Sequence, residues 1–335
     1  MSATADAAEA ARKRDGLPGG VEHAAQPDGA AAPALVLEGN ATRRAVTGLG
    51  FYGRAWFKLR RDPTTLIAGA VLGIIILATL LAPLITQHVL HTEPNTMVRG
   101  PDGRFAILKG PGAGFLLGTD DLGRDAVTRL LHAGRVSLSI GFLVMVISLS
   151  IGTTAGLAAG YFGGKVDDVI NAIIQVIFNV PSLFLLIILS VLFRPGVIGL
   201  SIIFGVLGWG GTARQVRGVV LSARNLDYVA AAQVLGASNV RIMAQHILPN
   251  VANIVLVVAG FDVAGAILGE SALSFLGFGV QVPTASWGNM LSGSQDLFRR
   301  APWLVYPPGA MIFITVLCVV LIADGLRDAL DPRVK

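Results

Sequence analysis

Six long apolar segments constrain the fold of this chain more than any other feature of its sequence. They are Thr64–Thr86, Val136–Gly160, Val169–Phe193, Val197–Ala213, Asn250–Phe278 and Pro302–Ala323. The first contains 23 residues and no charge. A helix that rises about 1.5 Å per residue needs roughly 20 residues to cross a hydrocarbon core of about 30 Å. We therefore predict an all-α, polytopic membrane protein with six transmembrane helices.

Composition and charge agree with a membrane location. Charged residues make up 14% of the chain, whereas soluble domains carry about a quarter. The net charge of +5 could indicate a nucleic-acid partner, but much of the basic charge lies beside apolar segments. Cations in such places serve topology and contact with anionic lipid. We expect membrane lipid as a partner and no nucleic acid.

Lysines and arginines also orient the chain. If the N-terminus is cytoplasmic, 17 of the 26 lie on the cytoplasmic side, as the positive-inside rule requires. We expect both termini in the cytoplasm. The predicted parts are a disordered cytoplasmic tail, a juxtamembrane segment with the first helix, an outer loop, a core containing a cytoplasmic loop at 214–249, and a short C-terminal tail. Their bounds are 1–45, 46–86, 87–135, 136–330 and 331–335.

The second and third predicted helices carry local signals. Glycines recur in the second at every fourth position: Gly152, Gly156, Gly160 and Gly164. Such a stripe lets a neighbouring helix approach closely, and packing within the bundle is favoured here over a substrate path. Pro181 is expected to kink the third helix.

The outer loop ends in a segment with amphipathic spacing. Its apolar members are Val127, Leu130, Leu131 and Gly134. This pattern predicts a short helix over 126–135 that lies along the membrane surface.

The loop after the fourth apolar segment has more structure than a simple connection needs. Tyr228, Ala231, Ala232 and Leu235 recur at helical spacing. Gly236 permits a turn, and 237–246 can form a second short helix. Pro249 suits the first turn of the fifth membrane helix. Spacing alone leaves two hypotheses open: docking to a partner, and a helical hairpin on the bilayer surface.

This loop resembles the EAA loop of ABC importer permeases, a pattern of Glu-Ala-Ala, three residues, Gly and a later Leu-Pro. Ala231, Ala232, Gly236, Leu248 and Pro249 match it, and Ala230 stands where the family has Glu. The resemblance implies a coupling helix that docks to an ATPase subunit. The coupling residues would be Tyr228, Ala231, Ala232, Leu235, Gly236, Ala237, Leu248 and Pro249.

Three further stretches resemble the C-type subunit of the peptide, nickel and opine permeases. They are Leu117–Asp125, Glu270–Gly277 continuing to Pro283–Met290, and Asp324–Pro332. The signature residues of the first are Gly118, Thr119, Asp120, Gly123, Arg124 and Asp125. The Arg61–Pro63 entry to the first helix also fits.

The resemblance implies the transmembrane domain of a type I ABC importer. Its function would be the translocation of di- or oligopeptides across the bacterial cytoplasmic membrane by alternating access. The implied partners are a second, homologous permease, two ABC ATPase subunits and an extracytoplasmic solute-binding protein. Nickel, glutathione or opines are alternative substrates. A stand-alone secondary carrier, which inverted repeats would support, and a membrane-embedded hydrolase are alternatives from other classes.

No catalytic motif is present in the sequence. It contains no Gly-x-x-x-x-Gly-Lys-Ser/Thr phosphate loop, no His-Glu-x-x-His and no Gly-x-Ser-x-Gly, and its single cysteine is Cys318. We expect a non-enzymatic subunit without its own cofactor or metal, and the resemblance assigns ATP and Mg²⁺ to the partner ATPases. His88 and His91 are not expected to bind a metal.

Asp262 and Glu270 are the ionisable residues inside the apolar segments. Carboxylates at membrane depth face a bundle interior, a partner or water. They are eight residues apart and therefore share one face of the fifth helix. Both are candidates for the translocation path, where Asp262 would meet a cationic group. The alternative for each is a hydrogen bond between helices, or a pair with Arg or Asn on the partner subunit.

Overall fold

The computed structural model describes residues 51–100, 103–112 and 114–330. The tails predicted at 1–45 and 331–335 lie outside these ranges. Within them every regular element is helical, and strand pairing is limited to isolated bridges in the segment before α6. Five helices are long and apolar enough to cross a membrane, and a bent pair of helices passes the same test together, which gives six spans when the pair is counted as one. The six predicted transmembrane segments are confirmed.

The first span follows a short helix, α3 (Phe51–Leu59), and consists of α4 (Pro63–Leu80), α5 (Ala82–Ile85) and a π-helical turn (Thr86–Leu90). Asp62 caps α4 by accepting hydrogen bonds from the backbone N–H groups of Thr64 and Thr65. The hydroxyl of Thr65 also donates to this carboxylate, which holds the pKa of Asp62 below its usual value.

The second span, α6 (Ala126–Phe162), is one continuous helix. The prediction of a separate surface helix over 126–135 is therefore wrong. The apolar side of these residues is covered by protein: Trp287 Nε1 donates to the carbonyl of Leu130 at 3.1 Å. Gly134 lies directly against Trp287 and Thr79. An amphipathic pattern does not distinguish a lipid surface from a protein surface, which explains the error.

Glycines bring α6 against α9 (Val197–Ala223). A Cβ added at Gly152 would lie 2.6 Å from the Thr212 Cβ, and one at Gly160 would lie 2.6 Å from the Val220 Cβ. Gly156 is equally close to α9. Packing within the bundle is thus the role of these three. Gly164 does not belong to the stripe, because it begins α7 and its Cβ would have open space.

The third span is broken into α7 (Gly164–Asn179) and α8 (Ser182–Phe193), which meet at 81°. Pro181 therefore separates two helices where the sequence predicts only a kink. Val180, directly before the proline, has an extended backbone, as expected for a residue in that position.

The remaining elements complete the bundle. The connection after α9 holds α10 (Asp227–Val234), α11 (Asn239–Ile242) and a π-helical turn (Met243–Ile247). It leads into α12 (Leu248–Phe275). The second connection holds α13 (Trp287–Met290), α14 (Ser294–Leu297) and a 3₁₀ turn (Pro302–Leu304), followed by α15 (Tyr306–Leu330). Both α9 and α15 extend beyond the predicted apolar segments.

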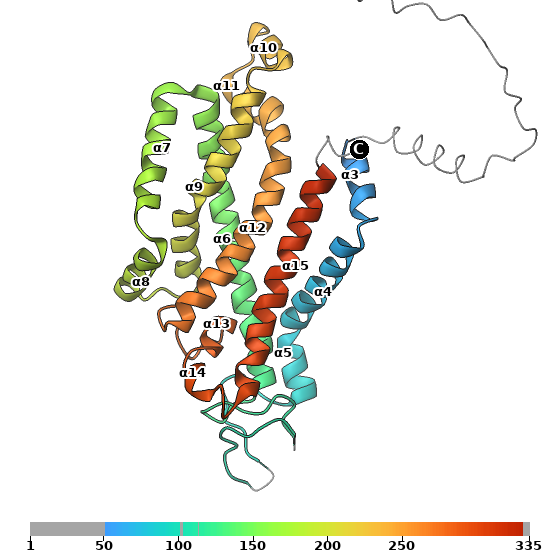
Figure 1. Cartoon of the computed structure of the whole chain (residues 1–335), viewed down its shortest axis with the longest axis vertical. Helices are drawn as coiled ribbons and strands as arrows, with labels where there is room; N and C mark the ends of the chain where they lie inside the picture. Colours follow the sequence, from blue (N-terminus) through green and yellow to red (C-terminus); the bar gives the residue numbers. More distant parts are fainter. Residues whose placement is uncertain (1–50, 101–102, 113, 331–335) are drawn as a thin grey trace, which may run out of the picture. The chain divides into compact units, whose positions relative to one another are not determined.

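The bundle has two distinct ends (Figure 1). One carries α10 and α11, and the end of α15 and α3 lie on the same side. We call it the α10 end. The other, the α13 end, carries α13, α14 and the segment 91–125 that precedes α6.

Candidate functional site

The loop after α9 forms a hairpin whose inner side is part of the core. We use the term hairpin for α10, α11 and the π-helical turn that follows. Its buried residues form one cluster with residues of α9 and α12: Val216, Val220, Ala223, Val229, Ala232, Ile242, Ile247 and Val251. Leu157 and Tyr161 of α6 pack against the same cluster. The hairpin is therefore fixed to three of the spanning helices.

Polar contacts fix the hairpin further. The Tyr161 hydroxyl donates to Asn239 Oδ1 at 3.0 Å, which joins α6 to α11. Asn250 Nδ2 donates to the Tyr228 hydroxyl at 2.7 Å, which joins α12 to α10. Arg224, directly after α9, donates to the carbonyl of Gly160 at the end of α6. These bonds resist any movement of the hairpin relative to the bundle.

The outer side of the hairpin exposes large apolar side chains. Val234 is 87% exposed, Leu235 86% and Val240 70%. Leu235 also lines a hollow of about 440 Å³, with Tyr228 and Ala231 in its wall. Exposed apolar surface of this kind is typical of interaction sites.

A tight turn connects α10 to α11. Gly236 has φ +78°, in the left-handed region that favours glycine. Its N–H donates to the carbonyl of Gln233, and the N–H of Ala237 donates to that of Ala232. A Cβ at Gly236 would meet nothing within 4 Å. The backbone conformation, and not lack of space, therefore requires glycine here.

The structure separates the predicted coupling residues into two groups. Those on the outer side of the hairpin are Tyr228, Ala231, Leu235 and Gly236, whereas Ala232, Ala237 and Leu248 are buried or half-buried. Pro249 lies in the first turn of α12, as predicted. Val234 and Val240 were missed. Their sequence signal is that an aliphatic residue lies on each side of the Gly236 turn. Neither residue falls on the three- and four-residue spacing of Tyr228, Ala231 and Leu235, by which the apolar face was predicted.

Glu270 is fully buried at the α13 end of α12. Its carboxylate accepts from Ser274 Oγ at 2.6 Å and from Ser286 Oγ at 2.7 Å. Ser137 of α6 donates to its other oxygen at 3.5 Å and accepts from the N–H of Trp287. The carboxylate is thus hydrogen-bonded to α6, α12 and the cap of α13.

Asp262 lies two turns closer to the α10 end and is partly buried. Its carboxylate accepts a hydrogen bond from Thr212 Oγ1 at 3.3 Å, and Ser148 lies 3.4 Å from the same hydroxyl. Asp262 is thus hydrogen-bonded to α9, whereas Glu270 is hydrogen-bonded to α6, and the shared face of the two carboxylates stays a prediction.

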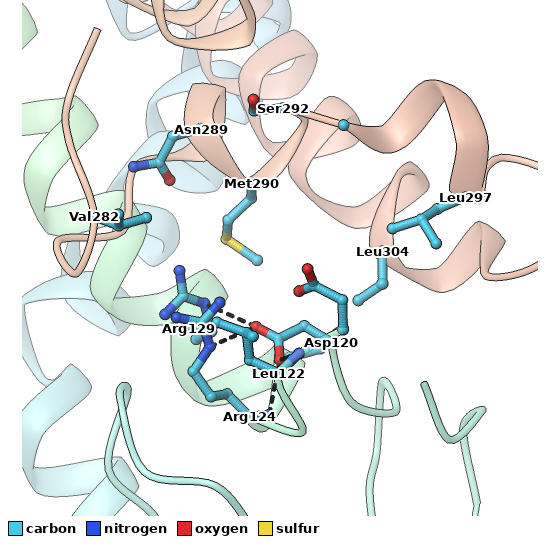
Figure 2. A pocket seen from close by; sticks show the side chains of 13 residues that line it. Asp120, Leu122, Arg124, Arg129, Val282, Asn289, Met290, Ser292, Leu297 and Leu304 are labelled. Carbon is cyan, nitrogen blue, oxygen red and sulfur yellow. Dashed lines mark hydrogen bonds and ion pairs between the residues drawn. The ribbon is translucent and has the colours of Figure 1, made fainter. Parts of the chain in front are cut away.

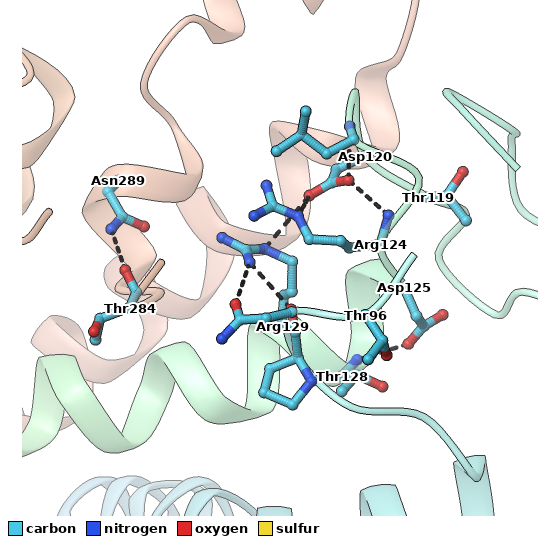
Figure 3. A network of polar contacts seen from close by, with 12 residues as sticks. Thr96, Thr119, Asp120, Arg124, Asp125, Thr128, Arg129, Thr284 and Asn289 are labelled. Carbon is cyan, nitrogen blue, oxygen red and sulfur yellow. Dashed lines mark hydrogen bonds and ion pairs between the residues drawn. The ribbon is translucent and has the colours of Figure 1, made fainter. Parts of the chain in front are cut away.

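The signature segment before α6 is arranged around Asp120 (Figure 3). Asp120 Oδ1 accepts from the N–H groups of Leu122 and Arg124 at 3.0 and 2.8 Å. Its Oδ2 accepts from Arg124 Nε at 2.7 Å and lies 3.5 Å from Arg129 Nε. One carboxylate therefore holds two guanidinium groups.

The other signature residues fix the backbone of this segment. The Thr119 hydroxyl donates to the carbonyl of Ala106 and accepts from the N–H of Lys109. Asp125 caps α6 through the N–H of Thr128 at 2.8 Å. Gly118 and Gly123 both have φ +71°. A Cβ at Gly118 would also lie only 2.4 Å from the carbonyl oxygen of Lys109.

Arg124 and Arg129 line a pocket of about 280 Å³ at the α13 end (Figure 2). Figure 2 shows both arginines beside Asp120, with Met290, Leu297 and Leu304 also around the pocket. No group of three or more potential metal ligands of the His, Cys, Asp or Glu type occurs in the part of the chain that the structure describes.

Comparison with known proteins places this architecture in a family. Residues 152–335 match the family described as the inner membrane component of binding-protein-dependent transport systems. Residues 50–99 match the N-terminal transmembrane domain of oligopeptide transport permease C.

Several curated relatives align over most of their length. The dipeptide transport system permease protein DppC of Alkalihalophilus pseudofirmus is 37% identical over 86% of this chain and 92% of the relative. The oligopeptide transport system permease protein OppC is 35% identical in Bacillus subtilis, over 90% of this chain and 96% of the relative. OppC of Escherichia coli is also 35% identical, over 89% and 96%. The chain belongs to the family of inner membrane components of binding-protein-dependent transport systems and is an ABC transporter permease.

Proposed function

We propose that this chain is one of two membrane-spanning subunits of an ATP-driven importer that moves di- and oligopeptides across the cytoplasmic membrane by alternating access. The names of its relatives support the peptide substrate. The α10 end, where α3 begins and α15 ends, faces the cytoplasm, and both termini are cytoplasmic. The α13 end faces outward and receives peptide from an extracytoplasmic solute-binding protein.

Coupling to ATP hydrolysis occurs through the hairpin. The observation that carries this proposal is its two-sided construction: exposed Val234, Leu235 and Val240 on one side, and a cluster shared with α9 and α12 on the other. The exposed side docks to an ABC ATPase. The buried side transmits displacement to the spanning helices, because packed cores move as rigid elements. ATP and Mg²⁺ are held by the two ATPase subunits.

Three further features of the bundle fit contacts with lipid, the second permease and the peptide. On α7 and α8 large side chains face outward, among them Val176, Phe184 and Leu192, and this surface suits both lipid and the second permease. Asp262 serves the peptide path, where its carboxylate meets the amino group of the substrate. Arg60, directly after α3, stacks over the ring of the exposed Trp56 in that helix, an arrangement that suits an interface with anionic lipid.

Co-purification and uptake test this function together. The tagged chain, expressed with its transport partners, is expected to bring down an ATPase and a sister permease. In proteoliposomes with the solute-binding protein, the complex should import peptide only when ATP is on the side of the hairpin. Peptide movement by this chain alone in liposomes would overturn the proposal. So would labelling of a cysteine at position 235 from outside intact cells.

A further inference from the structure

The pocket at the α13 end has unused capacity to bind an anion. Arg129 is only 4% exposed, so its charge is held in the protein instead of being solvated. Its Nη1 donates to the carbonyl of Pro94 at 3.1 Å and to Asn95 Oδ1 at 3.3 Å. Its Nε faces Asp120. Among the described residues, nothing accepts a hydrogen bond from its Nη2.

Arg124 adds donors to the same pocket. Its Nε is bound to Asp120, and its two terminal nitrogens have no hydrogen-bond acceptor within the ranges that the structure describes. The Asp120 carboxylate already accepts from two backbone N–H groups. It therefore acts as a brace that holds both guanidinium groups toward the pocket. Two guanidinium groups in a fixed arrangement match the geometry of an oxyanion, because each can donate in parallel to two oxygens.

The size and lining of the pocket indicate what kind of anion it takes. Its volume of about 280 Å³ lies below the roughly 300–1,000 Å³ of small-molecule sites, and it suits one inserted side chain better than a peptide. Met290, Leu297 and Leu304 provide apolar walls for methylene groups. Asp121 is exposed and also lines the pocket. The negative charge of Asp121 would repel a carboxylate that enters the pocket. Its removal therefore tests whether the occupant is an anion.

We infer that this pocket receives an acidic side chain, Asp or Glu, of the solute-binding protein when that protein docks at the α13 end. The inference rests on the proposed function, because it requires the α13 end to face outward. It adds the chemistry of the contact: a carboxylate inserted between Arg124 and Arg129, with its methylene groups against Met290 and Leu304.

The test measures the affinity of the solute-binding protein for the complete transporter in nanodiscs. Arg124→Gln should weaken binding about tenfold, because it removes one partner of a desolvated charge pair. Arg299→Gln removes an exposed positive charge at the same end, outside the pocket. It should leave the affinity within about twofold. Arg124→Lys keeps the positive charge but loses the two parallel N–H donors of the guanidinium, so it should give an intermediate loss of affinity. It replaces Arg124→Gln in the test if the transporter with Arg124→Gln does not assemble.

Two further arms identify the occupant. Asp121→Asn should strengthen docking about two- to threefold, because a like charge is removed. Weaker docking of Asp121→Asn would mean that the Asp121 carboxylate binds a positively charged group. That result would indicate a zwitterionic occupant, such as a peptide, and would overturn the inference. In addition, one acidic residue of the solute-binding protein should lose affinity on conversion to its amide, with no further loss in the Arg124→Gln transporter.

Unchanged affinity in both Arg124 variants would also overturn the inference. The proposed function would survive that result, provided that the ATPase still co-purifies and peptide uptake persists. Absence of the ATPase from the wild-type preparation would instead contradict the proposed function itself. The two failures are therefore distinguishable.

Discussion

The hydroxyl of Tyr228 in α10 accepts a hydrogen bond from Asn250 in the first turn of α12, at 2.7 Å. The two residues are separated by the whole hairpin, so this bond closes it at its base. In the proposed coupling, this bond would pass a displacement of α10 to α12, the helix that carries Asp262 and Glu270.

Tyr228→Phe removes this bond and keeps the ring. The expected loss is about 1 kcal/mol of local stability, the usual net value of one hydrogen bond. Hydrogen–deuterium exchange of the α10 amides should then be about fivefold faster. Tyr306→Phe is the matched control, because its ring is 60% exposed and contacts Phe298 through its aromatic edge. Equal exchange in the two variants would show that the base of the hairpin does not depend on Tyr228.

Leu235→Glu places a charge on the exposed apolar side of the hairpin. Burial of this charge against an ATPase would be strongly unfavourable, so we expect the yield of co-purified ATPase to fall at least about tenfold. Gln233→Glu adds the same charge at an exposed position of the same helix and should retain most of the ATPase. Full co-purification with Leu235→Glu would place the docking surface elsewhere.

Gly236→Val forces a β-branched residue into a backbone with φ +78°, at a cost of about 1–3 kcal/mol. We expect the turn to rearrange, so that peptide uptake and its associated ATP hydrolysis both fall while membrane insertion persists. Gly103→Val imposes similar strain at the opposite end, at φ +72° and in open space, and should leave coupling intact. Normal uptake with Gly236→Val would contradict the proposed role of the hairpin.

Gly156→Ala tests the contact between α6 and α9. The new methyl carbon would lie 2.6 Å from the carbonyl oxygen of Ala213 and 2.7 Å from the Val216 Cβ. Overpacking of this kind costs about 1–3 kcal/mol, and the thermal unfolding midpoint of the complex should fall. Gly218→Ala, on α9 with open space, should keep or slightly raise the midpoint, because alanine favours a helix. A stable Gly156→Ala variant would mean that the two helices can separate without loss.

Asp262→Asn removes the charge proposed to meet the peptide amino group and keeps the shape of the side chain. Uptake of peptides with a free amino terminus should fall several-fold, a loss of about 1 kcal/mol or more. N-acetylated peptides, if transported, should be little affected. Asp168→Asn removes an exposed charge from α7 and should change neither. Unchanged uptake kinetics with Asp262→Asn would assign the carboxylate to packing between helices.

The number and position of the spans could be predicted from sequence because uncharged apolar runs have few alternatives in a membrane. Their ends could not. The helix α9 continues to Ala223 because basic residues find partners in the bundle: Arg217, within α9, pairs with Asp167 of α7, and Arg224, directly after α9, donates to the carbonyl of Gly160 near the end of α6. In the sequence, the positive charge of these residues indicated that they lie in the cytoplasmic loop and not in the helix. Pairing between distant segments is not visible in a local pattern.

The hairpin, too, could be predicted only in part from the sequence. Its helical spacing and the Gly236 turn were visible in sequence, and so was its resemblance to a coupling loop. Which side faces outward was not, since Ala231 and Ala232 are adjacent and look alike in sequence. In the structure Ala232 belongs to the buried cluster with Val220 and Ile247, whereas Ala231 is exposed. For this reason Val234 and Val240 were missed.

The hydrogen bonds around Glu270 have a consequence for the α13 end, which is the outer mouth of the proposed importer. Through Ser286 and Trp287 they fasten α13 to α12 and α6, and a Cβ at Gly288 would lie 2.5 Å from the Ser271 Cα. Such a segment has no freedom to swing as a flap. In the proposed importer, α13 would therefore move together with α12, so that opening at the α13 end and rearrangement around Asp262 would occur in one step.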